Sequence, residues 1–274
     1  MATEVFAPAK VNLTLHITGR RDDGYHLLDS LVAFADVGDR LGVALSDAPH
    51  LAVTGPMAAG VPLGGNNLAL RAARLMGADV RVTLDKHLPA AAGLGGGSSD
   101  AAACMRAVAA LTGRPLPDAQ AAAALGADVP VCLLARAARM RGIGEEVAPL
   151  ASFPPLNAVL VNPGVAVPTG GVFARMMQTS NPPMPARLPD WPDAAALIDW
   201  LAAQRNDLEE PAIALQPVIG DLLKAIGAQP GCGLARMSGS GATCFGLFKT
   251  QAAAQKAARA LARPGWWTEA VTLS

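Results

Sequence analysis

The sequence predicts an α+β fold of two domains, and three observations support this fold class. Segments with alternating apolar residues, typical of strands, recur along the chain. Between them lie segments whose apolar residues repeat at helical spacing. The composition changes near residues 152–155, where two prolines precede a new apolar segment. We therefore expect an N-terminal domain over residues 1–153 and a C-terminal domain over residues 154–274.

The elements of the first half follow in order. Residues 3–17 alternate loosely and are expected to form a strand pair or a bulged strand. Further strands are expected over residues 27–46, 50–54 and 80–84. A helix is predicted over residues 66–76, where an Asn can cap the first turn. The strand at 80–84 leads into a glycine-rich stretch, and a second helix is predicted over residues 101–112, closed by Gly113 and Pro115.

The second half is expected to form a split βαβ arrangement, because its helices alternate with strands that can pair antiparallel. Strands are predicted over residues 157–162, 242–248 and 267–273. Helices are predicted over residues 193–204, 214–227 and 250–262. A proline-rich loop at residues 181–192 and a glycine turn at residues 238–241 separate these elements.

Composition narrows the classes of partner. The 22 Lys and Arg residues balance 22 Asp and Glu residues, so the positive excess typical of nucleic-acid and membrane binders is missing. The four cysteines have neither disulfide-framework nor zinc spacing, and no metal ligand set is expected. The apolar segments are too short for a membrane span, and the N-terminus lacks a signal-peptide pattern. We expect a cytoplasmic monomer or weak homodimer that binds a small molecule.

A glycine-rich stretch at residues 93–100 is the first candidate binding site. Its backbone N–H groups, together with the start of the following helix, can bind a phosphate group. The alternative is a flexible loop in which Ser98 or Ser99 caps the helix. The stretch lacks the lysine of a Walker A loop and the glycine spacing of a dinucleotide fingerprint.

Three separated segments of the chain resemble the three motifs of the GHMP kinases. They are residues 8–15, 89–102 and 237–245, in that order. Further segments, at residues 24–26, 125–130, 162–169 and 205–209, resemble a branch that acts on a cytidine-diphosphate-linked methylerythritol. The resemblance implies ATP-dependent phosphorylation of a 2-hydroxyl in the non-mevalonate isoprenoid route. It also implies an N-terminal domain like domain 2 of ribosomal protein S5 and a ferredoxin-like C-terminal domain.

Asp128 and Lys10 are the candidate catalytic residues. Asp128 is the lone acid in the apolar stretch 119–135, where an unpaired carboxylate would be costly. The resemblance implies that Asp128 is the catalytic aspartate and that Lys10 is its partner. A buried pair would keep the carboxylate ionised and place an ammonium beside the acceptor hydroxyl. The alternative is that Asp128 caps a helix at Val129 and that Lys10 extends to solvent.

Tyr25 and His26 are the candidate nucleobase contacts. In a glycine-led turn, an aromatic ring can stack on a base while the imidazole binds the edge of the base. The alternative is a hairpin turn that packs on its own strand. The resemblance implies a cytidine pocket with Phe173 as the second aromatic wall and Thr169 close by. Gly170 and Gly171 stand where a proline often follows this threonine, which loosens the loop.

The resemblance also assigns the remaining contacts. Those to ATP are Asn67, which meets adenine, and Pro89, Gly93, Leu94, Gly95, Gly96, Gly97, Ser98 and Ser99. Those to the acceptor are Asn12, at its erythritol end, and Gly239. Either Asn could instead serve a turn or a helix cap. Mg²⁺ arrives with ATP and needs only one or two protein ligands, for which Ser98 and Ser99 are candidates. Asp100, which could orient the loop or cap the helix, is not assigned to metal.

Two alternatives to this function are considered. One is a different GHMP kinase, acting on an acceptor without a base, such as homoserine or mevalonate, which would have no use for Tyr25 and His26. The other is a non-catalytic RNA-binding module, because the S5-like domain also occurs in a ribosomal protein. Fold similarity alone does not carry function, and the chain lacks a basic stripe.

Overall fold

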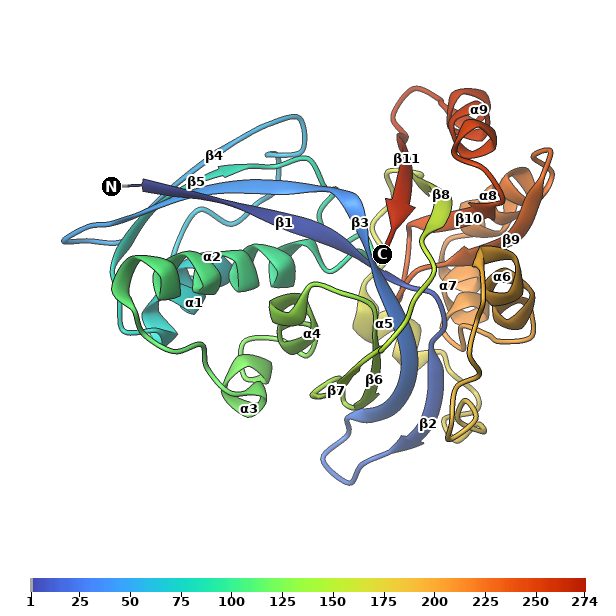
Figure 1. Ribbon diagram of the computed structural model, residues 1–274, viewed down its shortest axis with the longest axis horizontal. Helices are drawn as coiled ribbons and strands as arrows, with labels where there is room; N and C mark the ends of the chain where they lie inside the picture. The colour runs from blue at the N-terminus through green and yellow to red at the C-terminus, as the bar shows by residue number, and fades with distance from the viewer. Residues whose placement is uncertain (1) are drawn as a thin grey trace.

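The computed structural model describes residues 2–274 (Figure 1). Met1, the first residue of the predicted N-terminal domain, lies outside the described residues. The first half is built on the long strand β3 (His26–Leu45), which pairs antiparallel with several neighbours. These are β1 (Ala2–Asn12), β2 (His16–Arg20), β5 (Val80–Asp85) and β6 (Ala138–Gly142). The residues expected to form a strand pair or a bulged strand form β1 and the start of β2, which both pair with β3, and β1 has a register shift between Pro8 and Lys10.

Two further strands complete this sheet. The edge strand β4 (His50–Thr54) pairs parallel to β5, and β7 (Glu146–Pro149) pairs with β6. The sequence did not predict β6 and β7. They span only five and four residues, and neither has the β-branched and aromatic residues that are typical of a strand beyond Val147.

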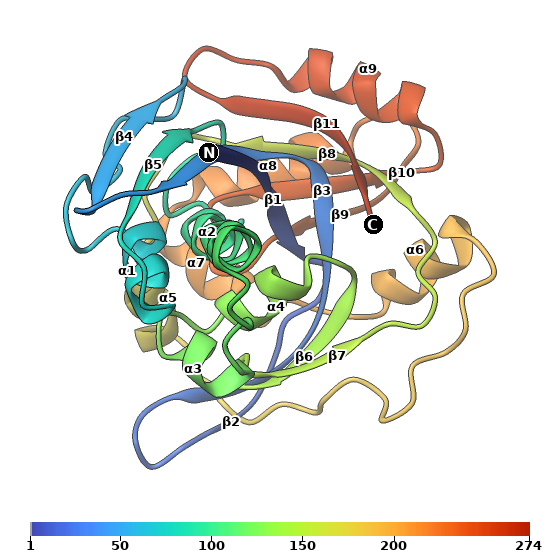
Figure 2. The same cartoon turned by 60° about the vertical axis from the view of Figure 1, so that its left-hand side comes forward.

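Helices α1 (Leu68–Leu75) and α2 (Gly96–Thr112) pack together on one side of the strands β1, β3 and β5 (Figures 1 and 2). The shorter helices α3 (Ala119–Ala123) and α4 (Val129–Leu134) follow. Helix α2 begins at Gly96, inside the glycine-rich stretch, and not at residue 101 as the sequence predicted. The first turn of this buried helix is therefore made of glycine and serine, and it leaves its backbone N–H groups uncovered by large side chains.

The second half has the predicted split βαβ arrangement. The strands β8 (Leu156–Asn162), β9 (Cys232–Met237), β10 (Cys244–Phe248) and β11 (Trp267–Leu273) are ordered β11-β8-β10-β9, and all neighbours are antiparallel. Helices α8 (Val218–Gly227) and α9 (Gln251–Leu261) pack on these strands, and α6 (Ala194–Ala202) packs against β9. This strand order is the ferredoxin-like order expected for the C-terminal domain.

Two differences from the predicted helices have local causes. The helix predicted over residues 214–227 is interrupted at Pro217, which lacks a backbone N–H, and divides into α7 (Glu209–Leu215) and α8. Helix α5 (Thr169–Ala174) was missed, because its Gly170 and Gly171 are poor helix formers.

The two halves are joined through β3 and β11. Leu273 pairs with Ala35, and Phe34 and Ser274 exchange two backbone hydrogen bonds of 2.9 Å. The C-terminus therefore lies in the middle of the molecule, beside β3 (Figure 1). An apolar core that includes Val11, Leu31 and Phe245 continues across this junction. Among residues 2–274, no helix combines the length and the apolar character needed to cross a membrane.

Candidate active site

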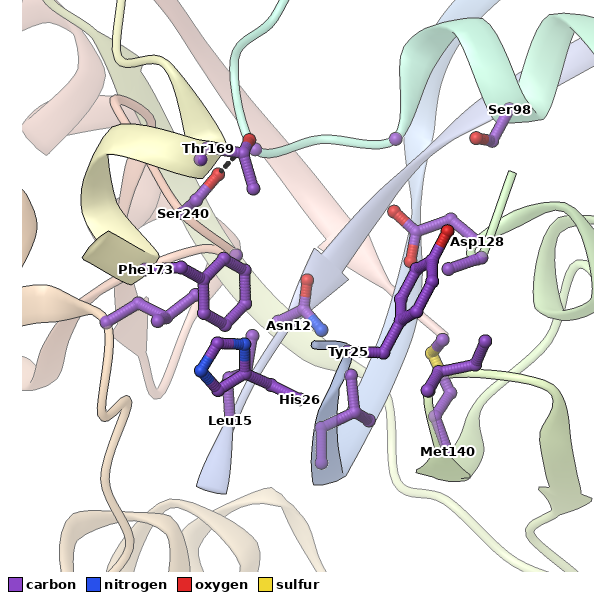
Figure 3. A pocket seen from close by; sticks show the side chains of 18 of the residues that line it. Asn12, Leu15, Tyr25, His26, Ser98, Asp128, Met140, Thr169, Phe173 and Ser240 are labelled. Atoms are coloured by element: carbon purple, nitrogen blue, oxygen red, sulfur yellow. Dashed lines mark hydrogen bonds between the residues drawn. The ribbon is translucent and has the colours of Figure 1, made fainter. Parts of the chain in front are cut away.

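A cavity of about 1010 Å³ opens between the two halves of the fold, and Figure 3 shows side chains that line it. Its walls come from β1, the β2–β3 hairpin, the start of α2, α5 and the glycine turn after β9. Most of the residues predicted for the site line this one cavity. They are Lys10, Asn12, Tyr25, His26, Gly93, Gly95, Gly96, Gly97, Ser98, Asp128, Thr169, Phe173 and Gly239.

Two glycines of the loop have a positive φ and lie close to neighbouring segments. Gly93 has φ +75°, and a Cβ there would lie 2.2 Å from the carbonyl oxygen of Ser238. Gly95 caps α2 with φ +63°, and a Cβ there would lie 3.4 Å from the Lys10 side chain. The loop therefore packs between β1 and the glycine turn at residues 238–241.

Four residues predicted to bind ATP lie off the cavity. Ser99 is fully buried, and its hydroxyl donates to the Pro8 carbonyl at 2.8 Å, so it anchors the loop to β1. Leu94 is also buried, and its carbonyl accepts from the Lys10 backbone N–H at 2.9 Å. Asn67 caps α1 by accepting from the Ala69 N–H, and Pro89 precedes the loop. Contacts of these four residues with ATP stay a prediction.

Ser98 and Ser99 do not cap α2, because Gly95 occupies the cap position and no side chain caps the helix. The hydroxyl-bearing Ser98 lines the cavity from the first turn of α2. The two adjacent serines therefore have different surroundings. Helical geometry turns successive side chains to different faces, so one serine can meet the cavity while the next is buried.

Lys10 and Asp128 form the predicted ion pair, with 2.8 Å between Nζ and Oδ2. The lysine side chain is 4% exposed, whereas the Asp128 side chain is 33% exposed, so the pair is open to the cavity on one side and not buried as expected. Asp128 does stand at the cap position of α4, as the alternative required. Its carboxylate makes no capping bond, however, and reaches Lys10 instead.

A second lysine cluster lies behind the loop, and the sequence analysis missed it. The ammonium of Lys86 lies 2.5 Å from Asp39 Oδ2 and 2.8 Å from Asp100 Oδ2. All three side chains are buried. Asp39 Oδ1 also accepts from the backbone N–H groups of His87 and Leu88. Asp100 thus neither caps the helix nor faces the cavity, and it ties the first turns of α2 to the end of β5.

Burial and mutual charge shift the pKa values of Asp100 and Lys86 in this cluster. Burial raises the pKa of Asp100 to about 7, with Lys86 opposing the shift and Asp39 adding to it. The same two carboxylates raise the pKa of Lys86 despite the cost of burying its ammonium. Lys86 is thus held as a cation between two acids.

The aromatic residues differ in arrangement from the prediction. His26 stacks on Phe173, with ring centroids 4.5 Å apart and an interplanar angle of 20°. Tyr25, which is 60% exposed, lies across the cavity from them with its ring directed toward Asp128 (Figure 3). Burial, reinforced by the Arg20 guanidinium, lowers the pKa of His26, so the imidazole is neutral at pH 7. The His26 imidazole thus covers the Phe173 ring, which was expected to face the cytosine base.

The glycine turn at residues 238–241 connects the loop to β1 and to α5. The Ser238 hydroxyl donates to the Gly93 carbonyl at 2.8 Å and accepts from the Asn12 N–H at 3.0 Å. Ser240 Oγ lies 2.9 Å from Thr169 Oγ1, the contact drawn as a dashed line in Figure 3. Asn12 Nδ2 donates to Ser30, and Asn12 Oδ1 is buried without a hydrogen-bond partner among the described residues.

Metal ligands are sparse at this site. In the part of the chain that the structure describes, His, Cys, Asp and Glu side chains do not gather in threes around a metal position. Of the oxygen-bearing side chains that line the cavity, those of Ser98 and Asp128 lie beside the glycine loop and the start of α2.

Known proteins resemble the chain over its whole length. The family model of the GHMP kinases N terminal domain matches residues 67–136, and that of the GHMP kinases C terminal domain matches residues 186–265. The 4-diphosphocytidyl-2-C-methyl-D-erythritol kinase of Cereibacter sphaeroides is 60% identical over 271 residues, covering 97% of this chain and 98% of that protein. The kinase of the same name from Paracoccus denitrificans is 56% identical, covering 98% of this chain and 96% of that protein.

Solved structures of kinases also match the chain over nearly its whole length. The crystal structure of a 4-(cytidine 5'-diphospho)-2C-methyl-D-erythritol kinase is 39% identical, with a TM-score of 0.79 and 99% of each chain covered. Homoserine kinase from Cytophaga hutchinsonii is 19% identical with a TM-score of 0.65, covering 100% of this chain and 94% of that one. At this lower identity the likeness concerns the fold alone.

Proposed function

The chain belongs to the 4-diphosphocytidyl-2-C-methyl-D-erythritol kinases, a branch of the GHMP kinases, and from this premise we propose the roles of its residues. The enzyme phosphorylates the 2-hydroxyl of 4-diphosphocytidyl-2-C-methyl-D-erythritol with ATP, in the non-mevalonate route to isoprenoid precursors. The observation that carries the proposed roles is the half-open pair of Lys10 and Asp128 beside the first turn of α2.

The phosphates of ATP bind at Gly93 to Ser98. The first turn of α2 has backbone N–H groups without intrahelical acceptors, and the positive end of the helix dipole lies there. These groups suit a phosphate group, as at other helix N-termini. Gly96 and Gly97 leave them accessible from the cavity. Leu68, next to Asn67, also lines the cavity, which supports binding of adenine near the start of α1.

Asp128 receives the proton of the acceptor hydroxyl. As the hydroxyl oxygen forms its bond to the γ-phosphorus, the bond from that phosphorus to the bridging oxygen of ADP breaks, and the proton passes to Asp128. Lys10, whose Nζ lies 2.8 Å from Asp128 Oδ2, balances the charge of the carboxylate and offsets negative charge on the phosphoryl group during transfer. Positioning and electrostatic stabilisation are the main contributions a kinase makes to this reaction.

Mg²⁺ enters with ATP. The Ser98 hydroxyl and the Asp128 carboxylate are hard oxygen donors on the wall of the same cavity, and Mg²⁺ commonly takes one or two protein ligands of this kind. These residues therefore fit the ion, and Ser98 is its proposed ligand. When bound, the ion neutralises charge on the phosphates.

The cytosine ring binds between Tyr25 and Phe173, with His26 at its edge. For this the His26 imidazole leaves Phe173, and the base takes its place against the ring. A neutral imidazole can donate one hydrogen bond and accept another, which suits the polar edge of cytosine. Replacing Tyr25 by Ala raises KM for the cytidine substrate roughly tenfold or more, since stacking of a base is worth about 1–3 kcal/mol. An unchanged KM would refute this placement.

The two domains meet at residues 153 and 154. Strand β7 ends at Pro149 within the N-terminal sheet, and β8 starts at Leu156 among the ferredoxin-like strands, which supports a boundary between them.

Product formation tests the function directly. The chain is incubated with ATP, Mg²⁺ and 4-diphosphocytidyl-2-C-methyl-D-erythritol, beside reactions with homoserine, mevalonate and no acceptor, and products are followed by phosphorus NMR. We expect one new phosphomonoester, formed from the cytidine substrate alone. Turnover of another acceptor would refute the cytidine pocket, and failure to bind ATP would refute the role of the glycine loop.

A further inference from the structure

The glycine turn after β9 presents backbone donors that the fold itself does not use. Within residues 2–274, the N–H groups of Gly239 and Ser240 have no hydrogen-bond acceptor. Both residues line the catalytic cavity. Gly239 has φ +57°, and successive N–H groups next to such a left-handed residue form a concave anion site. The turn is therefore suited to hold an anion in the cavity.

Asn206 holds this turn from the side away from the cavity. Its Nδ2 donates to the carbonyls of Met237 and Gly239, both at 2.8 Å, and its Oδ1 accepts from the Leu208 N–H at 3.0 Å. The residue is 7% exposed and belongs to a separate surface cavity beside α7. Every polar atom of the Asn206 side chain is thus engaged in fixing backbone.

The bond to the Gly239 carbonyl also fixes the direction of the next N–H. In a planar trans peptide the carbonyl and the following N–H point in opposite directions. Because the Gly239 carbonyl points toward Asn206, the Ser240 N–H points away from it, toward the cavity that Ser240 lines. We propose that Asn206 is a positioning residue, which aims the Ser240 N–H at the diphosphate of the acceptor substrate.

The surroundings of the turn identify the acceptor's diphosphate as the anion. Gly239 lies between Gly93 and Asn12, since a Cβ on this glycine would be 3.1 Å from the Gly93 carbonyl oxygen and 3.3 Å from Asn12 Oδ1. Ser240 is bound to Thr169, on the helix that carries Phe173. Asn12 and Thr169 are acceptor contacts implied by the family resemblance, and Phe173 is one in the proposed function, on which this inference rests. The phosphates of ATP are assigned to the first turn of α2, whose N–H groups are separate from those of the turn.

The test compares two probes that differ only in their phosphates. Binding of cytidine 5′-diphosphate and of cytidine is measured by calorimetry for the wild type and for Asn206→Ala. Losing an aligned hydrogen bond to an anion weakens binding about tenfold. We expect this loss for cytidine 5′-diphosphate only, together with a matching rise in KM for the full substrate. The kcat and the KM for ATP should stay within about twofold of wild type.

Asn162→Ala is the matched control. Asn162 is also buried, and its Nδ2 donates to Thr243 Oγ1 at 2.9 Å, beyond the turn. This variant loses a comparable buried amide, so it should lower Tm similarly while binding both probes as the wild type does. Should Asn206→Ala fail to fold, Asn206→Asp keeps the size of the side chain and the bond from Leu208, and its ionised form cannot donate.

The outcomes separate this inference from the proposed function. A loss confined to the diphosphate probe supports the positioning role. Equal weakening of both probes, or unchanged binding of both, in Asn206→Ala or Asn206→Asp overturns it. A wild type that binds neither probe overturns the cytidine pocket and this inference together, whereas wild-type binding with an unaffected variant overturns the inference alone.

Discussion

Two lysine and aspartate clusters lie on either side of one glycine loop, and they differ in their access to solvent. A Cβ on Gly95 would lie 3.4 Å from the Lys10 side chain and 3.6 Å from Asp128 Oδ2, whereas one on Gly96 would lie 3.2 Å from Lys86 Nζ. Lys10 pairs with a carboxylate that is 33% exposed in the cavity. Lys86 pairs with two carboxylates, of which Asp39 is 0% and Asp100 6% exposed.

The same residue types therefore serve different purposes. The Asp128 carboxylate can accept from a substrate hydroxyl while Lys10 stays beside it, because one side of the carboxylate meets the cavity. The carboxylates around Lys86 are surrounded by protein, where an ion that loses its partner is costly. Access, more than residue type, separates a pair that can react from a cluster that holds the loop in place.

The largest effect is expected on turnover at the open pair. Asp128→Asn removes the proposed proton acceptor while keeping the size of the side chain, so kcat should fall by about 10²–10⁴-fold. ATP binding and Tm should change little, because the pair is half-exposed and the loop stays in place. Steady-state kinetics and calorimetric titration with an ATP analogue measure the two effects. Turnover like that of the wild type would reject the role of Asp128.

At the buried cluster we expect the opposite pattern. Lys86→Met leaves Asp39 and Asp100 unpaired in the interior, which costs about 3–5 kcal/mol of unfolding free energy. For a chain of this size that lowers Tm by roughly 10 °C. Urea denaturation followed by circular dichroism measures the loss. The matched variant Lys10→Met should cost much less, and equal losses in the two variants would remove the distinction between the clusters.

A smaller effect is expected from the pH dependence of the buried cluster. The unfolded chain releases the Asp100 proton near pH 4, whereas the folded chain holds it to about pH 7. The raised pKa of Asp100 therefore stabilises the folded state at low pH. This stabilisation is lost as the pH rises from about 4 through about 7. Asp100→Asn should become more stable relative to the wild type as the pH rises from about 4 to about 7, with little further change above that. A Tm difference that does not change with pH would contradict the buried, raised pKa.

Whether the sequence alone predicts each lysine and aspartate cluster depends on how far apart its residues lie along the chain. The glycine loop and the helix after it could be predicted because their signals are local. Lys10 and Asp128 are far apart along the chain, and the family resemblance, more than the residues alone, indicated their pairing. Lys86 and Asp39 have neither a local pattern nor a motif, because β3 and β5 bring them together only in the folded sheet.

The aromatic pocket shows another kind of limit. Tyr25, His26 and Phe173 could be identified as a set from sequence, and all three line the cavity. Which ring stacks on which could not be predicted, because the order depends on rotamers and on what else occupies the cavity. In the structure the imidazole of His26 takes the position against Phe173. Helix α5, which carries Phe173, was missed for its glycines.

Single-turnover transfer of a radiolabelled γ-phosphoryl group separates the two lysines most sharply. Lys10→Met and Lys86→Met are compared with the wild type at saturating ATP and cytidine substrate, at a temperature at which circular dichroism shows both variants folded. We expect transfer in Lys10→Met to slow by about 10²-fold or more, and transfer in Lys86→Met to stay within roughly tenfold of the wild type. Equal slowing in both variants, or transfer at the wild-type rate in Lys10→Met, would contradict the assignment of chemistry to the open pair.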